Sequence, residues 1–155
     1  MEVGILTKLK TLILAIAGTV GGLILQLFGG ADAMLVTLLI LIITDYITGI
    51  TVAAVFKKST KTDTGGLSSK EGLKGIIKKV MMLVIVMIAV RIDIVLGTDY
   101  IRNAVVTAFI ANEIISLTEN AGLMGVPIPK IISNAIDILK RNADNESNDT
   151  SDNKK

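Results

Sequence analysis

The sequence predicts an all-α integral membrane protein with three or four transmembrane helices, a short C-terminal amphipathic helix and a disordered polar tail. Of the 155 residues, 51% are hydrophobic, and the mean hydropathy is +0.66. The apolar residues are gathered into blocks, and blocks of about 20 apolar residues are what a helix needs to cross the ~30 Å hydrocarbon layer of a bilayer. A soluble helical bundle would need a polar face on each helix, and the first two blocks have none.

The composition excludes several classes of site. The chain has no Cys and no His, which removes disulfides, thiolate metal sites and imidazole bases. It has no glycine-rich phosphate loop and no dinucleotide-binding fingerprint. Aromatic residues make up 3% of the chain and Trp is absent, which argues against a stacking surface for nucleic acid. The sequence therefore predicts no enzyme activity, no cofactor, no metal site and no nucleic-acid partner.

The predicted membrane domain covers residues 1–141, and the polar tail covers residues 142–155. Spans are expected at about residues 11–28, 33–56, 76–97 and 101–120, with an amphipathic helix at about 129–141. The fourth block is the least apolar, so the choice between three and four spans depends on it.

The first block admits two interpretations. Lys8 and Lys10 precede the apolar run, and Ala31-Asp32-Ala33 resembles a signal-peptide cleavage site. The run is longer than the 7–15 residues typical of a signal peptide, which favours a span. Gly18 and Gly22 form a G-x-x-x-G pair of the kind that lets membrane helices pack closely, although glycine is also simply tolerated in such helices.

A basic loop separates the second and third blocks. Basic residues favour the cytoplasmic side of a membrane, so four spans would place this loop and both termini inside a bacterial cytoplasmic membrane. The loop lysines are Lys57, Lys58, Lys61, Lys70, Lys74, Lys78 and Lys79.

The same loop shows a helix start. Ser68 and Glu71 fit a capping box, and Lys70, Lys74 and Lys78 then follow at intervals of four residues. This stripe predicts contact with anionic lipid headgroups, each Lys contributing roughly 1 kcal/mol. The alternative is that the lysines only set the topology.

Charged residues inside the spans form the candidate site. Helix rise places Asp45, Arg91 and Glu113 each about 16–18 Å from the membrane face assigned to its span, with Asp93 slightly further along. A charge at this depth needs a partner or water, and Arg91 is the base assigned to the three acids. We expect either a static ion pair or a network whose pairing differs between two assembly states.

A polar face on the fourth span accompanies these charges. One helical face holds Asn112, Glu113, Ser116, Glu119 and Asn120. Such a face needs a neighbouring helix or a water-filled lumen.

Three stretches together resemble the phage lysis holin family that includes the holin-like toxin-secretion proteins of clostridia. They are DYITGI from residue 45, SSKEGLKGIIKK from residue 68, and ANE from residue 111, which continues through Ser116, residues 119–121 and GVPIP from residue 125. The order and spacing of the three stretches carry the resemblance, which covers about residues 33–139.

The resemblance implies a small multi-pass protein of the cytoplasmic membrane that oligomerises into lesions. Through these lesions an endolysin or a toxin would leave the cell. The implied partners are further copies of the chain, the lipid bilayer and an antiholin. The alternatives are that the chain is itself an antiholin or regulatory subunit, or a small transporter.

Overall fold

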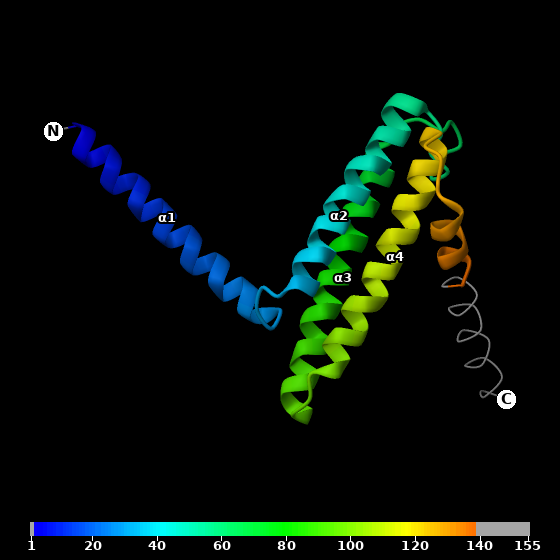
Figure 1. Ribbon diagram of the computed structural model, residues 1–155. Coiled ribbons are helices and arrows are strands. Elements are labelled where there is room, and N and C mark those ends of the chain that lie inside the picture. The colour runs from blue at the N-terminus through cyan, green and yellow to red at the C-terminus, as the bar shows by residue number, and fades with distance from the viewer. Residues whose placement is uncertain (1, 139–155) are drawn as a thin grey trace.

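The computed structural model describes residues 2–138, and all of its regular elements within that range are helical. The long helices are α1 (Glu2–Leu27), α2 (Ala33–Thr51), α3 (Ser69–Leu96) and α4 (Tyr100–Met124), and a π-helical turn, η1 (Val52–Phe56), extends α2 (Figure 1). Residues 130–138 form a further helix, within the range expected for the amphipathic helix. The predicted all-α class is confirmed, whereas residues 139–155, including the predicted tail, lie outside the described residues.

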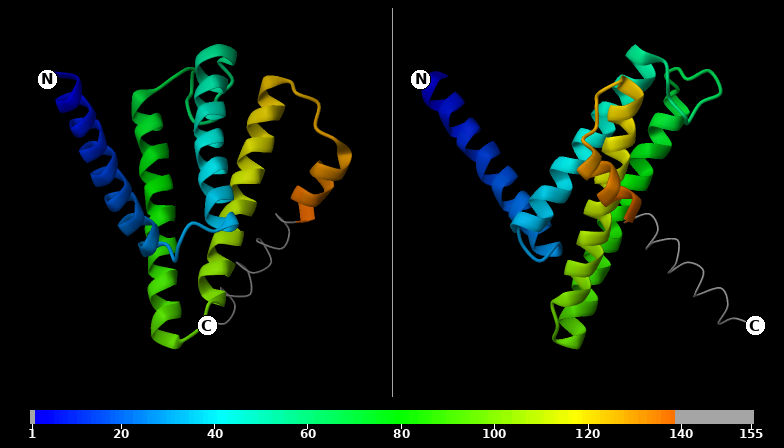
Figure 2. Two further views of the ribbon diagram at one scale, coloured as in Figure 1. Left: turned by 60° about the vertical axis from the view of Figure 1, so that its left-hand side comes forward. Right: turned by 45° about the vertical axis from the view of Figure 1, so that its right-hand side comes forward.

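Helices α2, α3 and α4 lie side by side and α1 leans away from them (Figures 1 and 2). Four residues, Leu38, Ile42, Val86 and Val106, form the buried apolar core between the three helices. From residue 6 onward the side chains of α1 are exposed or half-buried. The chain therefore consists of a three-helix bundle with one divergent helix at its N-terminal side.

Helix α3 begins at the predicted capping box. Its N-cap is Ser68, whose hydroxyl oxygen accepts a hydrogen bond from the Glu71 N–H at 3.4 Å, as the capping-box pattern predicts. The Glu71 carboxylate instead accepts a hydrogen bond from Lys74 at 2.7 Å. Because Lys is a good helix former and Ser a good N-cap, residues 69–75 are helical and continuous with the stretch that was expected to span the membrane from about residue 76.

A loop of residues 57–67 folds back over the end of α2. Helix η1 ends at Lys57, which has a left-handed backbone with φ of 51°, and its N–H bonds the Val52 carbonyl. The Ser59 N–H donates to the Gly65 carbonyl at 2.9 Å. At Gly65 φ is 68°, and a Cβ would stand 2.2 Å from the Lys57 carbonyl oxygen, so only glycine allows this close approach.

Two helices within the described residues are long and apolar enough to cross a membrane. They are Leu6–Leu27 and Ala33–Phe56. The prediction of three or four such spans is corrected on this point, because α3 carries Lys79, Arg91 and Asp93, and α4 carries Arg102, Glu113 and Glu119. These two helices lack the composition of independent membrane spans.

The bundle nevertheless buries several polar and charged residues and exposes many apolar side chains. Its buried polar residues are Asp45, Asp93, Arg102, Glu113 and Asn120. Its exposed apolar residues include Ile40, Ile43 and Ile47 of α2, and Ile85, Ile88 and Ile92 of α3. Soluble proteins seldom bury so many charges behind so much exposed apolar surface, whereas helices surrounded by lipid turn their ionisable groups inward.

Candidate functional site

A charge cluster formed by Lys79, Asp45 and Glu113 lies inside the bundle, with one residue from each of its three helices. The ammonium Nζ of Lys79 is 2.8 Å from Asp45 Oδ2 and 2.5 Å from Glu113 Oε2. The exposed fractions of these side chains are 14% for Lys79, 7% for Asp45 and 3% for Glu113. Two carboxylates therefore share one cation, so the cluster has a formal charge of −1 when all three groups are ionised.

Asn120 completes the bonding of Asp45. Its Nδ2 donates to Asp45 Oδ1 and to the Thr48 hydroxyl oxygen, each at 3.0 Å. Asn120 follows Glu113 by seven residues, which is about two helical turns and the same face. Consequently α4 supplies two polar contacts to the cluster, and each carboxylate oxygen of Asp45 has a partner.

Tyr46 packs beside the cluster against α3. A Cβ added at Gly72 would lie 3.8 Å from the Tyr46 hydroxyl oxygen, and a Cβ added at Gly75 would lie 3.9 Å from a carbon of the Tyr46 ring. These two glycines let the ring lie close to the helix backbone, next to the turn that holds Lys79. The small residues of α3 therefore set the distance between α2 and α3 at the level of the charge cluster.

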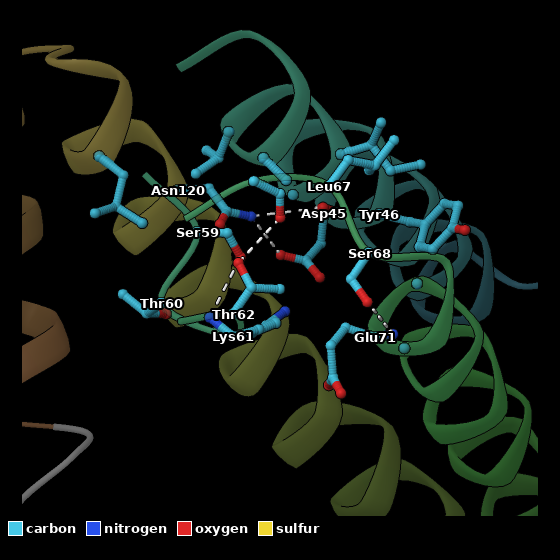
Figure 3. Close-up of a pocket in the computed structure, with 18 of the residues that line it drawn as sticks. Asp45, Tyr46, Ser59, Thr60, Lys61, Thr62, Leu67, Ser68, Glu71 and Asn120 are labelled. Carbon is cyan, nitrogen blue, oxygen red and sulfur yellow. Dashed lines mark hydrogen bonds between the residues drawn. The ribbon is translucent and has the colours of Figure 1, made fainter. Parts of the chain in front are cut away.

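A cavity of about 80 Å³ separates the cluster from the loop that covers it. Its walls include Asp45, Lys79 and Asn120, and the hydroxyl groups of Ser59 and Thr62 come from the loop (Figure 3). A cavity of this size is large enough for water, and its walls carry both polar and apolar groups. The cluster is thus buried from the surroundings of the bundle but adjoins this cavity at one end.

A second polar cluster closes the opposite end of the bundle around Arg102. Its Nη1 and Nη2 lie 2.6 and 3.0 Å from the two carboxylate oxygens of Asp32, and its Nε donates to the Phe28 carbonyl at 2.9 Å. The Arg102 guanidinium thereby holds the pKa of the Asp32 carboxyl below its ordinary value of 3.8. This contact ties the turn between α1 and α2 to the start of α4.

Asp93 organises the turn between α3 and α4. Its carboxylate accepts hydrogen bonds from the Thr98 hydroxyl at 2.5 Å and from the backbone N–H of Arg102 at 2.7 Å and of Ile101 at 3.2 Å. These N–H groups belong to the first turn of α4, where they have no partner within the helix. Asp93 is therefore a capping residue and not a member of the charge cluster.

Residues 22–141 match the bacteriophage holin family. The chain belongs to this family. It is 39% identical over 132 residues to an uncharacterised protein of Listeria monocytogenes, covering 83% of this chain and 89% of the relative. An uncharacterised 14.9 kDa protein of Clostridium perfringens is 38% identical over 120 residues, or 76% of this chain and 85% of the relative.

This holin-family chain is also similar to the probable holin of Bacillus phage phi105. The two are 31% identical over 111 residues, covering 71% of this chain and 76% of the phage protein. No solved structure matches the chain. The resemblance expected from the sequence is thus confirmed at the level of the family.

The three stretches that carried the resemblance to holins meet at the charge cluster. The first supplies Asp45, Tyr46 and Thr48, the second ends at Lys79, and the third supplies Glu113 and Asn120, as the contacts above describe. Their joint spacing in the sequence therefore corresponds to one shared site in space.

The structure corrects the expected partner of the acids. Asp45 and Glu113 come together as expected, but Lys79 joins them in place of Arg91. Arg91 is exposed, on the side of α3 that faces α1. The depth estimate placed Lys79 at the membrane face because the membrane span was expected to begin near residue 76. In the structure Lys79 lies ten residues into α3, or about 15 Å along it.

The predicted polar face of α4 is divided in the structure. Glu113 and Asn120 are buried, Ser116 is half-buried, and Asn112 and Glu119 are exposed. Glu113 and Asn120, on the inward part of the face, make contacts in the charge cluster. Asn112 and Glu119, on the outward part, lie at the surface of the bundle.

The remaining predicted residues lie on the surface. Among the loop lysines only Lys79 is turned inward, and Lys57, Lys58, Lys61, Lys70, Lys74 and Lys78 are exposed. If a Cβ were added at Gly18 or Gly22, no other part of the described chain would lie within 4 Å of it. Any close packing at these glycines would therefore involve a second molecule.

Sequence reasoning missed the contact between Asp32 and Arg102. Asp32 directly precedes an apolar helix, which is an N-cap signal, and its Oδ1 accepts the Leu35 N–H at 2.9 Å. That signal predicts the cap but not the partner, because Arg102 is 70 residues away in the sequence.

Proposed function

We propose that the chain acts as a holin of a phage or prophage, which assembles in the bacterial cytoplasmic membrane into lesions that release an endolysin or a toxin. The observation that carries this proposal is the charge cluster inside a bundle with apolar outer faces. Such a bundle fits a membrane, yet it stores groups that water would solvate far better than lipid. Membership of the holin family and the phage relative's name support the same conclusion.

In this proposal α2, α3 and α4 cross the membrane together. Neither α3 nor α4 is apolar enough alone, but Lys79 of α3 pairs inside the bundle with Asp45 and with Glu113 of α4, which lowers the cost of placing these charges in the membrane. The basic loop then lies in the cytoplasm and the turn between α3 and α4 outside, following the preference of lysines for the inner side. The α1 helix crosses separately beside the bundle.

Lesions open when copies of the chain associate and the cluster rearranges. In the resting bundle Glu113 and Asn120 face inward, while Asn112 and Glu119 face outward on the same helix. A rotation of α4 in the assembly would bring both parts of this face to a water-filled lumen. Ionised carboxylates cost much less in such a lumen than in a hydrocarbon layer.

The membrane potential supplies the trigger in this mechanism. Two acids and one base give the cluster an unbalanced charge when ionised, and moving one unit charge fully across 100 mV changes the free energy by ~2.3 kcal/mol. A fall in potential therefore changes the balance between the closed bundle and the open assembly.

Inducible expression in a bacterium tests the function. A holin should stop growth abruptly, collapse the membrane potential and release a co-expressed cytoplasmic reporter enzyme. An antiholin would instead delay lysis caused by another holin, and a transporter would do neither. Either of the last two results contradicts the proposal.

Single cysteines test the topology, since the chain has no native Cys. Ser59→Cys in the loop should resist an impermeant thiol reagent in intact cells, whereas Asp99→Cys between α3 and α4 should react. If α1 and α2 were the only spans, both positions would be cytoplasmic. Protection of Asp99→Cys would therefore reject the crossing of α3 and α4.

Substitution of the α1 glycines tests self-association. Gly18→Leu and Gly22→Leu meet nothing in the described chain, so they should leave the fold of one molecule intact and weaken cross-linked oligomers. Ala17→Leu, which adds the same side chain on another face of α1, is the matched control. Unchanged oligomers in both glycine variants would exclude this face from the assembly.

A further inference from the structure

Arg91 lies in an apolar groove between α1 and α3. Two adjoining hollows of ≈510 and ≈490 Å³ share Arg91 and Leu27 as lining residues. No acidic side chain lines either hollow, and no described residue forms an ion pair or hydrogen bond with the Arg91 side chain. The groove thus contains one unpaired cation among apolar walls.

The position of this groove is set by contacts at the end of α1. Arg102 donates a hydrogen bond to the Phe28 carbonyl, and the neighbouring Gly29 lies close to Val90 of α3 and to Arg102. The end of α1 is therefore held against the bundle while its beginning diverges (Figure 2). This arrangement leaves a wedge that opens between the two helices on one side of the contact.

The walls and the depth of the groove match a lipid. Leu23 and Ile24 line it from α1, and Met87, Ile88 and Val95 line it from α3. Arg91 precedes the end of α3 at Leu96 by five residues, or about 7.5 Å. A long Arg side chain at that depth reaches the membrane interface with its guanidinium while its stem stays in the apolar layer.

We propose that this groove binds an anionic phospholipid, with the phosphate on Arg91 and an acyl chain along the apolar walls. Guanidinium groups bind phosphate through paired charge-assisted hydrogen bonds, and the Gln26 amide at the same hollow offers a further donor. A second copy of the chain is a poorer source of the anion, because Asp32 and Asp93 at this end are already bonded within their own molecule, which leaves Asp99 in the exposed turn between α3 and α4 as the acid that a copy could offer. The site is placed at the outer leaflet by the topology of the proposed function, on which this inference rests.

Lipid retention by the purified protein tests this site. The protein is extracted in detergent with added phosphatidylglycerol or phosphatidylcholine, and the retained lipid is measured by native mass spectrometry. We expect selective retention of phosphatidylglycerol, with affinity about tenfold weaker in Arg91→Gln, as loss of one charge-assisted contact implies. Lys58→Gln removes the same charge from the loop at the other end and should retain the lipid as the wild type does.

A second variant separates the groove from the charge. Ile24→Trp keeps Arg91 and fills the groove, so it should also reduce lipid retention. Wild-type retention in Arg91→Gln, or equal losses in Arg91→Gln and Lys58→Gln, would overturn the proposal. The proposal would also be overturned if the protein formed dimers that were lost in both Arg91→Gln and Asp99→Asn. In that case the anion bound by Arg91 would come from a second copy of the chain. Lipid retention without lesions in cells would contradict only the proposed function.

Discussion

At the scale of single residues, the interior of the bundle is organised by Lys79. It lies within bonding distance of Asp45 on α2 and of Glu113 on α4, so its removal would leave two buried carboxylates without a cation. Breaking a buried ion pair by removing one partner costs about 3–5 kcal/mol, because the remaining charge stays uncompensated. The free energy of unfolding should therefore depend more on Lys79 than on any exposed lysine of the same helix.

We expect Lys79→Met to lower the free energy of unfolding in detergent micelles by about 3–5 kcal/mol. Lys78→Met is the matched control, since the neighbouring Lys78 is exposed and its loss should change stability by less than about 0.5 kcal/mol. Denaturation followed by circular dichroism gives both values. Similar losses in the two variants would mean that the charge cluster does not stabilise the bundle.

The contact between Arg102 and Asp32 predicts a defined pH dependence. Because the pKa of Asp32 is lower in the folded protein than its ordinary 3.8, the contact contributes stability above that pH and loses it as the pH falls through the folded pKa. Asp32 is 46% exposed, so the contribution at neutral pH is small, about 1 kcal/mol or less. Wild type and Asp32→Asn should differ in unfolding free energy at about pH 6 and converge at strongly acid pH. A constant difference would contradict this account.

The residues of the charge cluster could be predicted in part. Asp45 and Glu113 were identified because a carboxylate in an apolar helix needs a partner. Their true partner, Lys79, was not identified, because it ends a run of lysines that is typical of a solvated loop. The choice depended on where the membrane-spanning part of α3 was set to begin, and such boundaries are the least certain part of a sequence interpretation.

At the scale of elements, the loop of residues 57–67 covers the cavity next to the charge cluster. Its closure requires the left-handed backbone at Gly65, which brings this residue against the Lys57 carbonyl. A side chain at Gly65 would meet both the unfavourable φ and the steric contact. Loss of the closed loop would expose the cavity and one end of the cluster to water.

We expect Gly65→Ala to destabilise the closed loop by about 1–3 kcal/mol through backbone strain. Limited proteolysis of the purified protein should then cleave the loop faster than in wild type. Gly66→Ala is the control, because a Cβ there meets only the Thr64 hydroxyl at an ordinary 3.5 Å. Equal cleavage of Gly65→Ala and wild type would show that the loop tolerates another conformation.

The elements themselves were predicted unevenly. The bounds of α2 with η1 agree with the expected span of residues 33–56, because an Asp N-cap and a lysine-rich end mark a continuous apolar run. Helix α1 begins at residue 2, before the span that was expected from about residue 11. Apolar content indicates the part of a helix that spans the membrane and not a polar extension of the same helix. The contacts between α2 and α4 depend on distant residues and have no local signal.

At the scale of the whole molecule, apolar faces surround an interior that contains ionisable groups. The sequence predicts a membrane protein from its apolar blocks, and the structure adds that polar groups of α4 bond those of α2 and α3 inside the bundle. In the proposed function this bonding allows α3 and α4 to cross the membrane beside α2, although neither is long and apolar enough by itself.

The most direct test of the account is the time at which the membrane potential collapses in cells that express Glu113→Gln. This change keeps the shape of the side chain and removes the surplus acid, so the closed bundle becomes charge-balanced and collapse should come later than in wild type at equal membrane levels. Asp99→Asn removes a carboxylate outside the bundle and should keep the wild-type time. Collapse of Glu113→Gln on the wild-type schedule would contradict the role of the charge cluster as the switch.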